Sequence, residues 1–492
     1  MQIDSKSSFY NFIYPFQFDH TQFKSLADGI DRKEWPGKKR KLEVWETLDF
    51  PSEELLSHIA DFLNPPEGRS PTARLWQMGH AAMESLDGLG ANAEWILATP
   101  GGNIAFKILS VQLTLFKVGV GFLTLEIEPF SDGDNFGDWL NLLHYFRFFR
   151  GQRRVSLSLR KSAYDQETKQ RTMEAYFPEP AGGLNEHPDG TGSMNDLIES
   201  MLVTPQLAET WWHEVFIPGQ LMPYAVLNID EIEEDKIPQT IYRIRNFFHD
   251  QQPLFPAAED LSIEHDSLLH YTKNQWFFFS LDGGGFVSFN APQTEFFRIS
   301  LPDHLKKQYF LLFILALQQR FVLMSLESEV AVQWQMDLGS ENDEGQMRIR
   351  EEAFGNTQNL LLTFTARGYF VQVMQREHHH RCYRKWQEIF QVDQLLIDVN
   401  NEVRYMHNYL QTQHEIERQK AETERLKQRE AFQRRINLIA WFVGLPILLL
   451  SFLNVIGEKR LGIAVVTMVG SLAIGLVAYF TINYLTGRKP KG

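Results

Sequence analysis

Two long stretches near the C-terminus contain no charged side chain, and they restrict the fold of this chain more than any other feature. The first covers 21 positions (436–456, INLIAWFVGLPILLLSFLNVI) and the second covers 25 (461–485, LGIAVVTMVGSLAIGLVAYFTINYL). At helical rise, the shorter stretch already extends about 30 Å, which is the thickness of a hydrocarbon core. Neither stretch has a charged face, and core helices of soluble proteins are shorter. The sequence therefore predicts two transmembrane helices.

Only four residues separate the two stretches, so a tight antiparallel hairpin is predicted. These residues are Gly457, Glu458, Lys459 and Arg460. The segments outside the hairpin carry ten Lys/Arg, seven in 411–435 and three in 486–492, against two in the loop. Cytoplasmic flanks of membrane helices carry the excess of positive charge. We therefore expect both termini in the cytoplasm, in a multi-pass protein of the inner (cytoplasmic) membrane.

The remainder of the chain is strongly acidic, which suits a cytoplasmic body. Residues 411–492 carry a net charge of +6, which leaves −20 for residues 1–410 because the whole chain carries −14. An acidic surface argues against general nucleic-acid binding, which needs basic groups against phosphates. Cys382 is the single cysteine, so a disulfide within the chain is impossible, as is usual for a reducing compartment.

Residues 1–300 predict a mixed α/β cytoplasmic domain, and 301–385 predict its helical part. The expected strands are rich in aromatic and β-branched residues: 42–49, 73–78, 94–99, 104–115, 121–128, 211–217, 223–229 and 274–290. Asp282-Gly-Gly-Gly285 has the composition of a hairpin turn within the last of these. The sequence contains no phosphate loop, no G-x-S-x-G and no H-E-x-x-H, so we expect no enzymatic activity and no cofactor.

A long helical stalk is expected to connect this body to the membrane. Residues 386–435 contain neither proline nor glycine and would extend about 75 Å as one helix. Apolar residues follow a 3,4 spacing in the first half, which is typical of a helix that packs on other helices: Leu396, Val399, Val403, Met406 and Leu410. The charged second half is also compatible with a solvated rod.

One face of the stalk and of the first membrane stretch collects polar and small residues. In order they are Glu430, Gln433, Asn437, Ala440, Gly444, Ile447, Ser451 and Asn454. Polar groups that face lipid are costly, so this face must meet protein or water. Close packing through Ala440-x-x-x-Gly444 is one explanation. The other is a pore formed by several copies, with a lining that includes Glu430, Asn437, Gly444, Ser451 and Asn454.

A long cytoplasmic helix that continues into a first membrane helix, a very short outer loop and a C-terminal second helix together resemble the CorA-type divalent-cation transporters. Three further segments are similar to a divergent bacterial branch of that family: 114–130 (TLFKVGVGFLTLEIEPF), 309–331 and 360–390. The likeness covers 300–492 well and 1–300 only loosely. It implies a homopentamer whose first membrane helix lines a pore for Mg²⁺ or related divalent cations, regulated by the cytoplasmic domain.

The chain departs from that family at the outer mouth of the expected pore. The family has a Gly-Met-Asn motif at this point, whereas Val455, Ile456 and Gly457 occupy it here. The loop offers Glu458 beside Lys459 and Arg460, and a ring of basic residues would repel cations. The resemblance therefore supports the architecture and the assembly more strongly than selectivity for Mg²⁺.

An arginine-rich segment, FRFFRGQRRV, is a candidate ligand site in the acidic body. Arg147, Arg150, Arg153 and Arg154 are interleaved with phenylalanines, a pattern that can clamp an anionic ligand, although surface ion pairing is the more common explanation. Some CorA-like proteins are associated with antiviral CRISPR loci. A membrane effector that a nucleotide second messenger opens is therefore the alternative function, and a scaffold tethered by the hairpin is a third.

Glu377-His378-His379-His380 is a weaker candidate for a metal site. Adjacent histidines on a helix point about 100° apart, so they are poorly placed to share one metal. We expect a polar helix surface there, and an inert thiol at Cys382.

Overall fold

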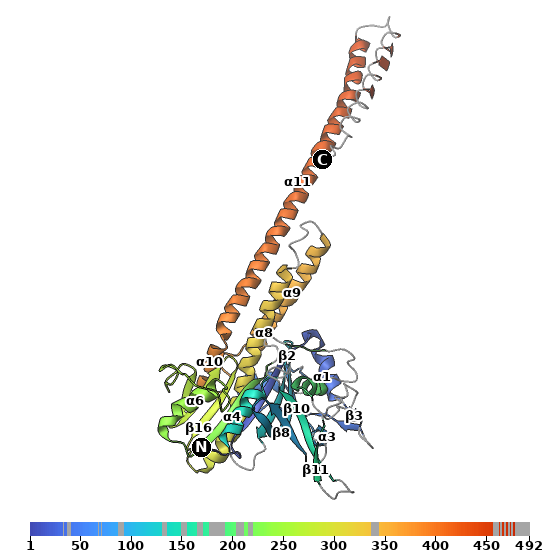
Figure 1. Ribbon diagram of the computed structural model, residues 1–492. Coiled ribbons are helices and arrows are strands. Elements are labelled where there is room, and N and C mark those ends of the chain that lie inside the picture. The colour runs from blue at the N-terminus through green and yellow to red at the C-terminus, as the bar shows by residue number, and fades with distance from the viewer. Residues whose placement is uncertain are drawn as a thin grey trace. The chain divides into compact units, whose positions relative to one another are not determined.

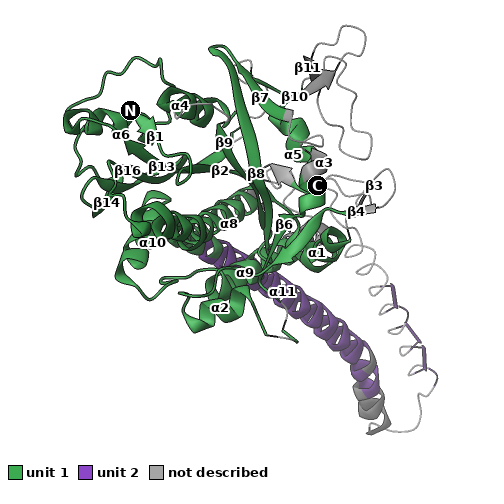
Figure 2. Cartoon of the chain, turned by 90° about the horizontal axis from the view of Figure 1, so that it is seen from below, with its two compact units in different colours: residues 1–403 green, residues 404–492 purple. Residues whose placement is uncertain are grey.

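A computed structural model describes most of the chain, in two compact units. The described residues are 1–32, 34–36, 41–66, 68–69, 71–86, 93–129, 135–148, 155–164, 171–176, 192–202, 211–214, 220–335 and 344–455, with single positions between 462 and 477. The first unit is Met1–Val403 and the second is Arg404–Gly492 (Figure 2). The helical segment 301–385 therefore belongs to the same unit as the sheet.

The first unit is built on one mixed β-sheet, in which 14 described strands take part (Figure 1). Its main path runs β11-β10-β7-β8-β9-β2-β13-β16-β15-β14. In chain order these strands are β2 (Phe9–Gln17), β7 (Ala93–Thr99), β8 (Gly102–Phe116), β9 (Val120–Pro129), β10 (Ser156–Tyr164), β11 (Arg171–Tyr176), β13 (Met222–Asp230), β14 (Leu268–Thr272), β15 (Gln275–Ser280) and β16 (Gly283–Phe289). Among the described pairings only β13 with β16 is parallel.

Short strands extend this sheet at its sides. β1 (Gln2–Ile3) pairs with β13, and β12 (His213–Glu214) pairs with β2. β5 (Trp45–Leu48) pairs with β6 (Ala73–Met78), which in turn pairs with β8. A separate pair consists of β3 (Glu34–Pro36) and β4 (Lys41–Glu43). The expected strand at 42–49 is thus divided between β4 and β5, because Val44 interrupts it.

Helices cover both faces of the sheet, which explains why its central strands are apolar at almost every position. On one face Tyr10 of β2 donates to the Trp139 carbonyl of α4 over 2.9 Å. On the other face Tyr224 of β13 packs against Phe313 of α8 (ring centroids 5.4 Å apart). The described helices before residue 290 are α1 (Phe23–Asp31), α2 (Ser57–Leu63), α3 (His80–Leu86), α4 (Phe136–Tyr145), α5 (Met194–Leu202) and α6 (Ile237–Arg245).

Helices dominate from residue 296 onward, as predicted from about residue 303. The series is η4 (Phe296–Ser300), α7 (Leu301–His304), η5 (Leu305–Tyr309), α8 (Phe310–Gln335), α9 (Glu344–Arg367), α10 (Glu377–Ile389) and α11 (Val392–Val455). Within the described residues, one helical stretch is long and apolar enough to cross a membrane, namely Phe296–Val332, and 83% of its most apolar window is buried inside the protein. This stretch includes most of α8, and its first half is buried because the sheet and α10 pack against it.

The stalk helix is confirmed as a long helix, but it begins later than expected. Trp386 lies in α10, and α11 starts at Val392 and continues for 64 residues through Pro446 to Val455. Gln391, between the two helices, has a φ of +55°, which no helix interior allows. The loop Gly457–Arg460 and most of the second uncharged stretch (461–485) lie outside the described residues.

The glycine run after Asp282 has a different role from the predicted turn. β15 and β16 do form a hairpin, but Gly283, Gly284 and Gly285 lie within β16. A Cβ on Gly285 would lie 1.8 Å from the Ala225 carbonyl oxygen of β13, and the φ of Gly285 is +154°. The glycines therefore permit the close approach of the parallel pair β13 and β16.

Candidate functional site

The expected pore-lining residues lie along α11. Glu430 and Asn437 are exposed, and a Cβ on Gly444 would meet nothing within 4 Å. Ser451 and Asn454 are helical in backbone and continue the same 3,4 spacing. Because α11 is one helix across this span, these five positions share one face. Glu458, Lys459 and Arg460, the expected pore mouth, lie outside the described residues.

A polar cavity of about 830 Å³ lies in the first unit, at the end of β13. It is bounded by the N-terminal segment Gln2–Phe9, by the ends of β9 and β13, and by η4 and α7. Because β13 and β16 are parallel, their carboxyl ends meet at this edge of the sheet, which is a common place for ligands. The cavity is therefore the strongest candidate in the body by position.

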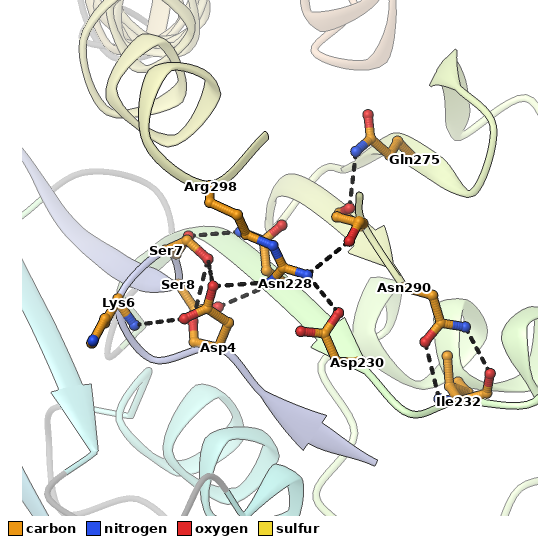
Figure 3. Close-up of polar contacts among 12 residues, drawn as sticks. Asp4, Lys6, Ser7, Ser8, Asn228, Asp230, Ile232, Gln275, Asn290 and Arg298 are labelled. Carbon is orange, nitrogen blue, oxygen red and sulfur yellow. Dashed lines mark hydrogen bonds and ion pairs between the residues drawn. The ribbon is translucent and has the colours of Figure 1, made fainter. Parts of the chain in front are cut away.

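Arg298 of η4 is the centre of the polar contacts beside this cavity (Figure 3). It donates to Asp4 Oδ2 over 3.0 Å, to Asp230 Oδ1 over 2.9 Å and to the Ala291 carbonyl over 2.8 Å. Although partial burial alone would raise it, the pKa of Asp4 is lowered by hydrogen bonds from Ser7 and Arg298. The pKa of Arg298 is raised by its bond to Asp230. These contacts fix the N-terminal segment to the end of β13.

Asparagine side chains complete the same junction. Asn228 of β13 donates to the Ser7 carbonyl over 2.7 Å, and its backbone N–H donates to Ser8 Oγ over 2.9 Å (Figure 3). Asn290, at the end of β16, donates to the Ile232 carbonyl over 2.8 Å.

A second ion pair lies inside the cavity. Lys306 of η5 pairs with Glu126 of β9, a carboxylate with 4% exposure that also accepts from Ser110 Oγ over 2.7 Å. Burial raises the pKa of the neighbouring Glu128, and the charge of Glu126 raises it further. Two of the three basic residues that line the cavity, Arg298 and Lys306, are thus already paired with carboxylates, whereas the third, Lys6, is exposed. The arrangement acts as a clamp between the sheet and the helices rather than as an open anion site.

The sequence analysis did not identify Arg298, Lys306 or Glu126. Alternation in β9 places Glu126 on the same face as Glu128, opposite Leu125 and Ile127, so the sequence pattern did not predict that Glu126 is buried.

Arg147 is the one arginine of the predicted ligand clamp that lies within the described residues. Arg147 is 7% exposed, and its guanidinium lies over the rings of Phe247 (4.7 Å) and Phe148 (5.5 Å). It therefore forms a buried cation–π contact between α4 and the segment after α6. Arg150, Arg153 and Arg154 lie outside the described residues.

The histidine run is not the polar surface that was expected. His379 is 2% exposed, and its Nδ1 lies 3.0 Å from Glu54 Oε2, while Arg376 pairs with Glu54 Oε1 over 3.0 Å. Burial lowers the pKa of His379 to about 3, and the nearby His378 and Arg376 contribute. No group of three or more His, Cys, Asp or Glu side chains in the described residues is arranged to hold a metal ion. Cys382 is buried, and burial raises the pKa of its thiol.

Comparison of the chain with protein-family models, with curated proteins and with solved structures gives no match.

Proposed function

We propose that this protein is a homo-oligomeric membrane ion channel or transporter of CorA-like build, which conducts Mg²⁺ or related divalent cations under the control of its cytoplasmic domain. The observation that carries the proposal is the continuity of α11. One helix runs from Val392, at the edge of the folded body, to Val455, at the end of the uncharged stretch. Such a helix can transmit a change in the body directly to residues at membrane depth.

The polar face of α11 supports a pore rather than a simple anchor. Asn437 and Gly444 lie on a face that is open in the single chain, while Ile439 and Leu449 are exposed apolar residues elsewhere on the helix. A single hairpin cannot enclose a channel, so the proposal requires several copies around a common axis. Contact of the polar face with pore water or with the other copies would then remove the free-energy cost of exposing polar groups to lipid.

Flux of Mg²⁺ into liposomes that contain the purified full-length protein tests the proposal. We expect uptake by the natural protein and at least a tenfold loss with Asn437→Leu, because an apolar ring at this depth would remove water from the pore. Ile439→Leu is the matched control and should leave uptake unchanged. An assembled, correctly folded protein without flux under any condition would reject the proposal and favour a tethered scaffold.

A membrane effector opened by a nucleotide second messenger is the second candidate, and the basic residues Lys459 and Arg460 favour it because they oppose a cation-selective mouth. It predicts liposomes that remain closed until a nucleotide is added, and then pass cations and anions alike. Constitutive uptake that is selective for Mg²⁺ would exclude it.

A further inference from the structure

A second pocket of the first unit has a volume of about 400 Å³. Its lining comes from α2, from the loop that follows it and from Arg367, the last residue of α9. Its described lining residues are His58, Asp61, Phe62, Pro65, Arg69, Thr72 and Arg367. A smaller pocket adjoins it, shares Thr72 and Arg367 with it, and is lined also by Lys117. We call the two together the α2–α9 pocket.

The basic side chains of the α2–α9 pocket differ from those of the large cavity, because carboxylates do not neutralise them. Arg69 and Arg367 are exposed and Lys117 is half-buried, and none of the three forms an ion pair in the described part of the chain. Among the described residues that line the two pockets, Asp61 is the one carboxylate. By contrast, Arg298 and Lys306 are both paired. Arg69 and Arg367 thus line one concavity and Lys117 lines the adjoining one, in a part of the chain (1–410) that carries a net charge of −20.

The loop that presents Arg69 is held in a defined position. Thr72 donates its hydroxyl to the Phe62 carbonyl, and the Thr72 carbonyl accepts from the Lys117 N–H over 2.8 Å. Gly68 adopts a φ of +90°, which allows the turn from Pro66 to Arg69. These hydrogen bonds anchor the backbone at Arg69 and Thr72 to the end of α2 and to the residue after β8.

The floor of the pocket is tied to the helices that lead into α11. The Phe62 ring stacks on Phe370, with centroids 6.2 Å apart. The Phe370 carbonyl accepts hydrogen bonds from Tyr383 and from Gln387 of α10, each over 3.0 Å. A ligand that bridges Arg69 and Arg367 would thus join the α2 loop to the segment between α9 and α10.

We propose that the α2–α9 pocket binds a small phosphate-bearing ligand. Guanidinium groups match the geometry of phosphate oxygens through paired N–H donors, and Lys117 adds a point charge beside them. The strongly acidic remainder of the body would repel anions elsewhere, so binding would be confined to this pocket. The proposal concerns binding alone and does not depend on the channel function.

Calorimetric titration of the full-length protein with pyrophosphate and with ATP tests this proposal. We expect saturable binding of both, with an affinity that falls as salt is raised because exposed charges are screened. Arg69→Gln and Arg367→Gln should each weaken binding at least tenfold. Tighter binding of ATP than of pyrophosphate would extend the recognised ligand to nucleotides, and equal binding would restrict it to the phosphate groups.

Arg381→Gln is the matched control, because Arg381 is an exposed arginine of α10 outside the pocket and should leave affinity unchanged. Thermal unfolding of each variant verifies that the fold is intact. Absence of binding at millimolar pyrophosphate and ATP would overturn the proposal. An affinity that is unchanged by both pocket substitutions would also overturn it. Binding of citrate as tight as that of pyrophosphate would have the same consequence. Absence of Mg²⁺ flux in the separate liposome measurement would not change the interpretation of these binding results.

Discussion

His379 is a buried histidine that remains neutral although a carboxylate lies beside it. Glu54 is within 3.0 Å of its Nδ1, but Arg376 already pairs with the other oxygen of Glu54. Burial, His378, Arg376 and His304 all lower the pKa of His379, to about 3, and the Tyr309 ring packs against it at 4.7 Å. The site therefore joins the loop before α2 to the start of α10 without needing a proton.

This environment predicts a pH dependence of stability. The unfolded chain takes up a proton at His379 below about pH 6.5, whereas the folded chain does not until about pH 3. The contribution of His379 to the free energy of unfolding is therefore fully present above pH 6.5. It is lost as the pH falls, and the loss amounts to about 2 kcal/mol at pH 5. Thermal or urea unfolding between pH 7.5 and 5 should show this loss in the natural protein and a smaller one in His379→Gln.

His20→Gln serves as the comparison for that measurement, since His20 is a part-exposed histidine of the short helix η1 (His20–Gln22). It should retain the pH dependence of the natural protein. An identical dependence in His379→Gln would show that another group is responsible.

At the scale of elements, the pairing of β13 with β16 depends on the absence of a side chain at Gly285. An added Cβ would lie 1.8 Å from the Ala225 carbonyl oxygen, and the φ of +154° is unfavourable for any residue with a Cβ. We expect Gly285→Ala to lower the free energy of unfolding by about 3 kcal/mol or more. Gly355→Ala in α9 is the control, because its Cβ would meet nothing within 4 Å. That substitution should stabilise the protein by up to about 1 kcal/mol. Equal effects in urea unfolding would contradict this interpretation.

Elements with a strong local pattern were predictable from the sequence. The strands expected at 73–78, 94–99 and 121–128 appear as β6, β7 and β9 with nearly the same bounds. Their aromatic and β-branched residues determine the local conformation. The start of α11 was not predictable, because the interruption at Gln391 has no glycine or proline to mark it.

Contacts between distant segments were beyond the sequence pattern. Arg298 donates hydrogen bonds to Asp4 and Asp230, which are separated from it by 294 and 68 positions in the sequence. Nothing in the local sequence around any of the three residues indicates these partners. The sequence around Arg147 is compatible with an exposed arginine and with one buried against Phe247. Only the structure shows that Arg147 is buried. Likewise, nothing in the local sequence indicated that Arg69, Lys117 and Arg367 line neighbouring pockets.

At the scale of the whole molecule, the α/β body and the long helix are present as predicted, whereas the membrane hairpin remains a proposal. The body and the remainder of the chain are separate compact units that divide at Val403 and Arg404. From 414 to 437 every residue of α11 is exposed, and Lys and Arg are frequent there. A protease specific for basic residues should therefore reach this part of the chain most easily.

Limited trypsin digestion of membranes that contain the protein tests the predicted anchoring. We expect cleavage between 418 and 435, release of a soluble fragment that contains residues 1–403, and retention of the C-terminal fragment in the membrane. The undigested protein should resist extraction by alkaline carbonate. Release of the intact chain by carbonate would contradict a membrane-spanning hairpin.

The position of β2 also has a consequence for biosynthesis. This strand lies between β9 and β13, so one of its edges can pair soon after residue 129 is made, whereas most of the other edge stays unpaired until β13 begins at residue 222. At about 5–20 residues per second, the ribosome needs roughly 5–20 s to bridge that gap. During this interval the nascent chain exposes an apolar, unpaired strand edge, which invites aggregation. A chaperone that shields nascent chains should therefore raise the yield of this protein, and slowed translation in this interval should lower it.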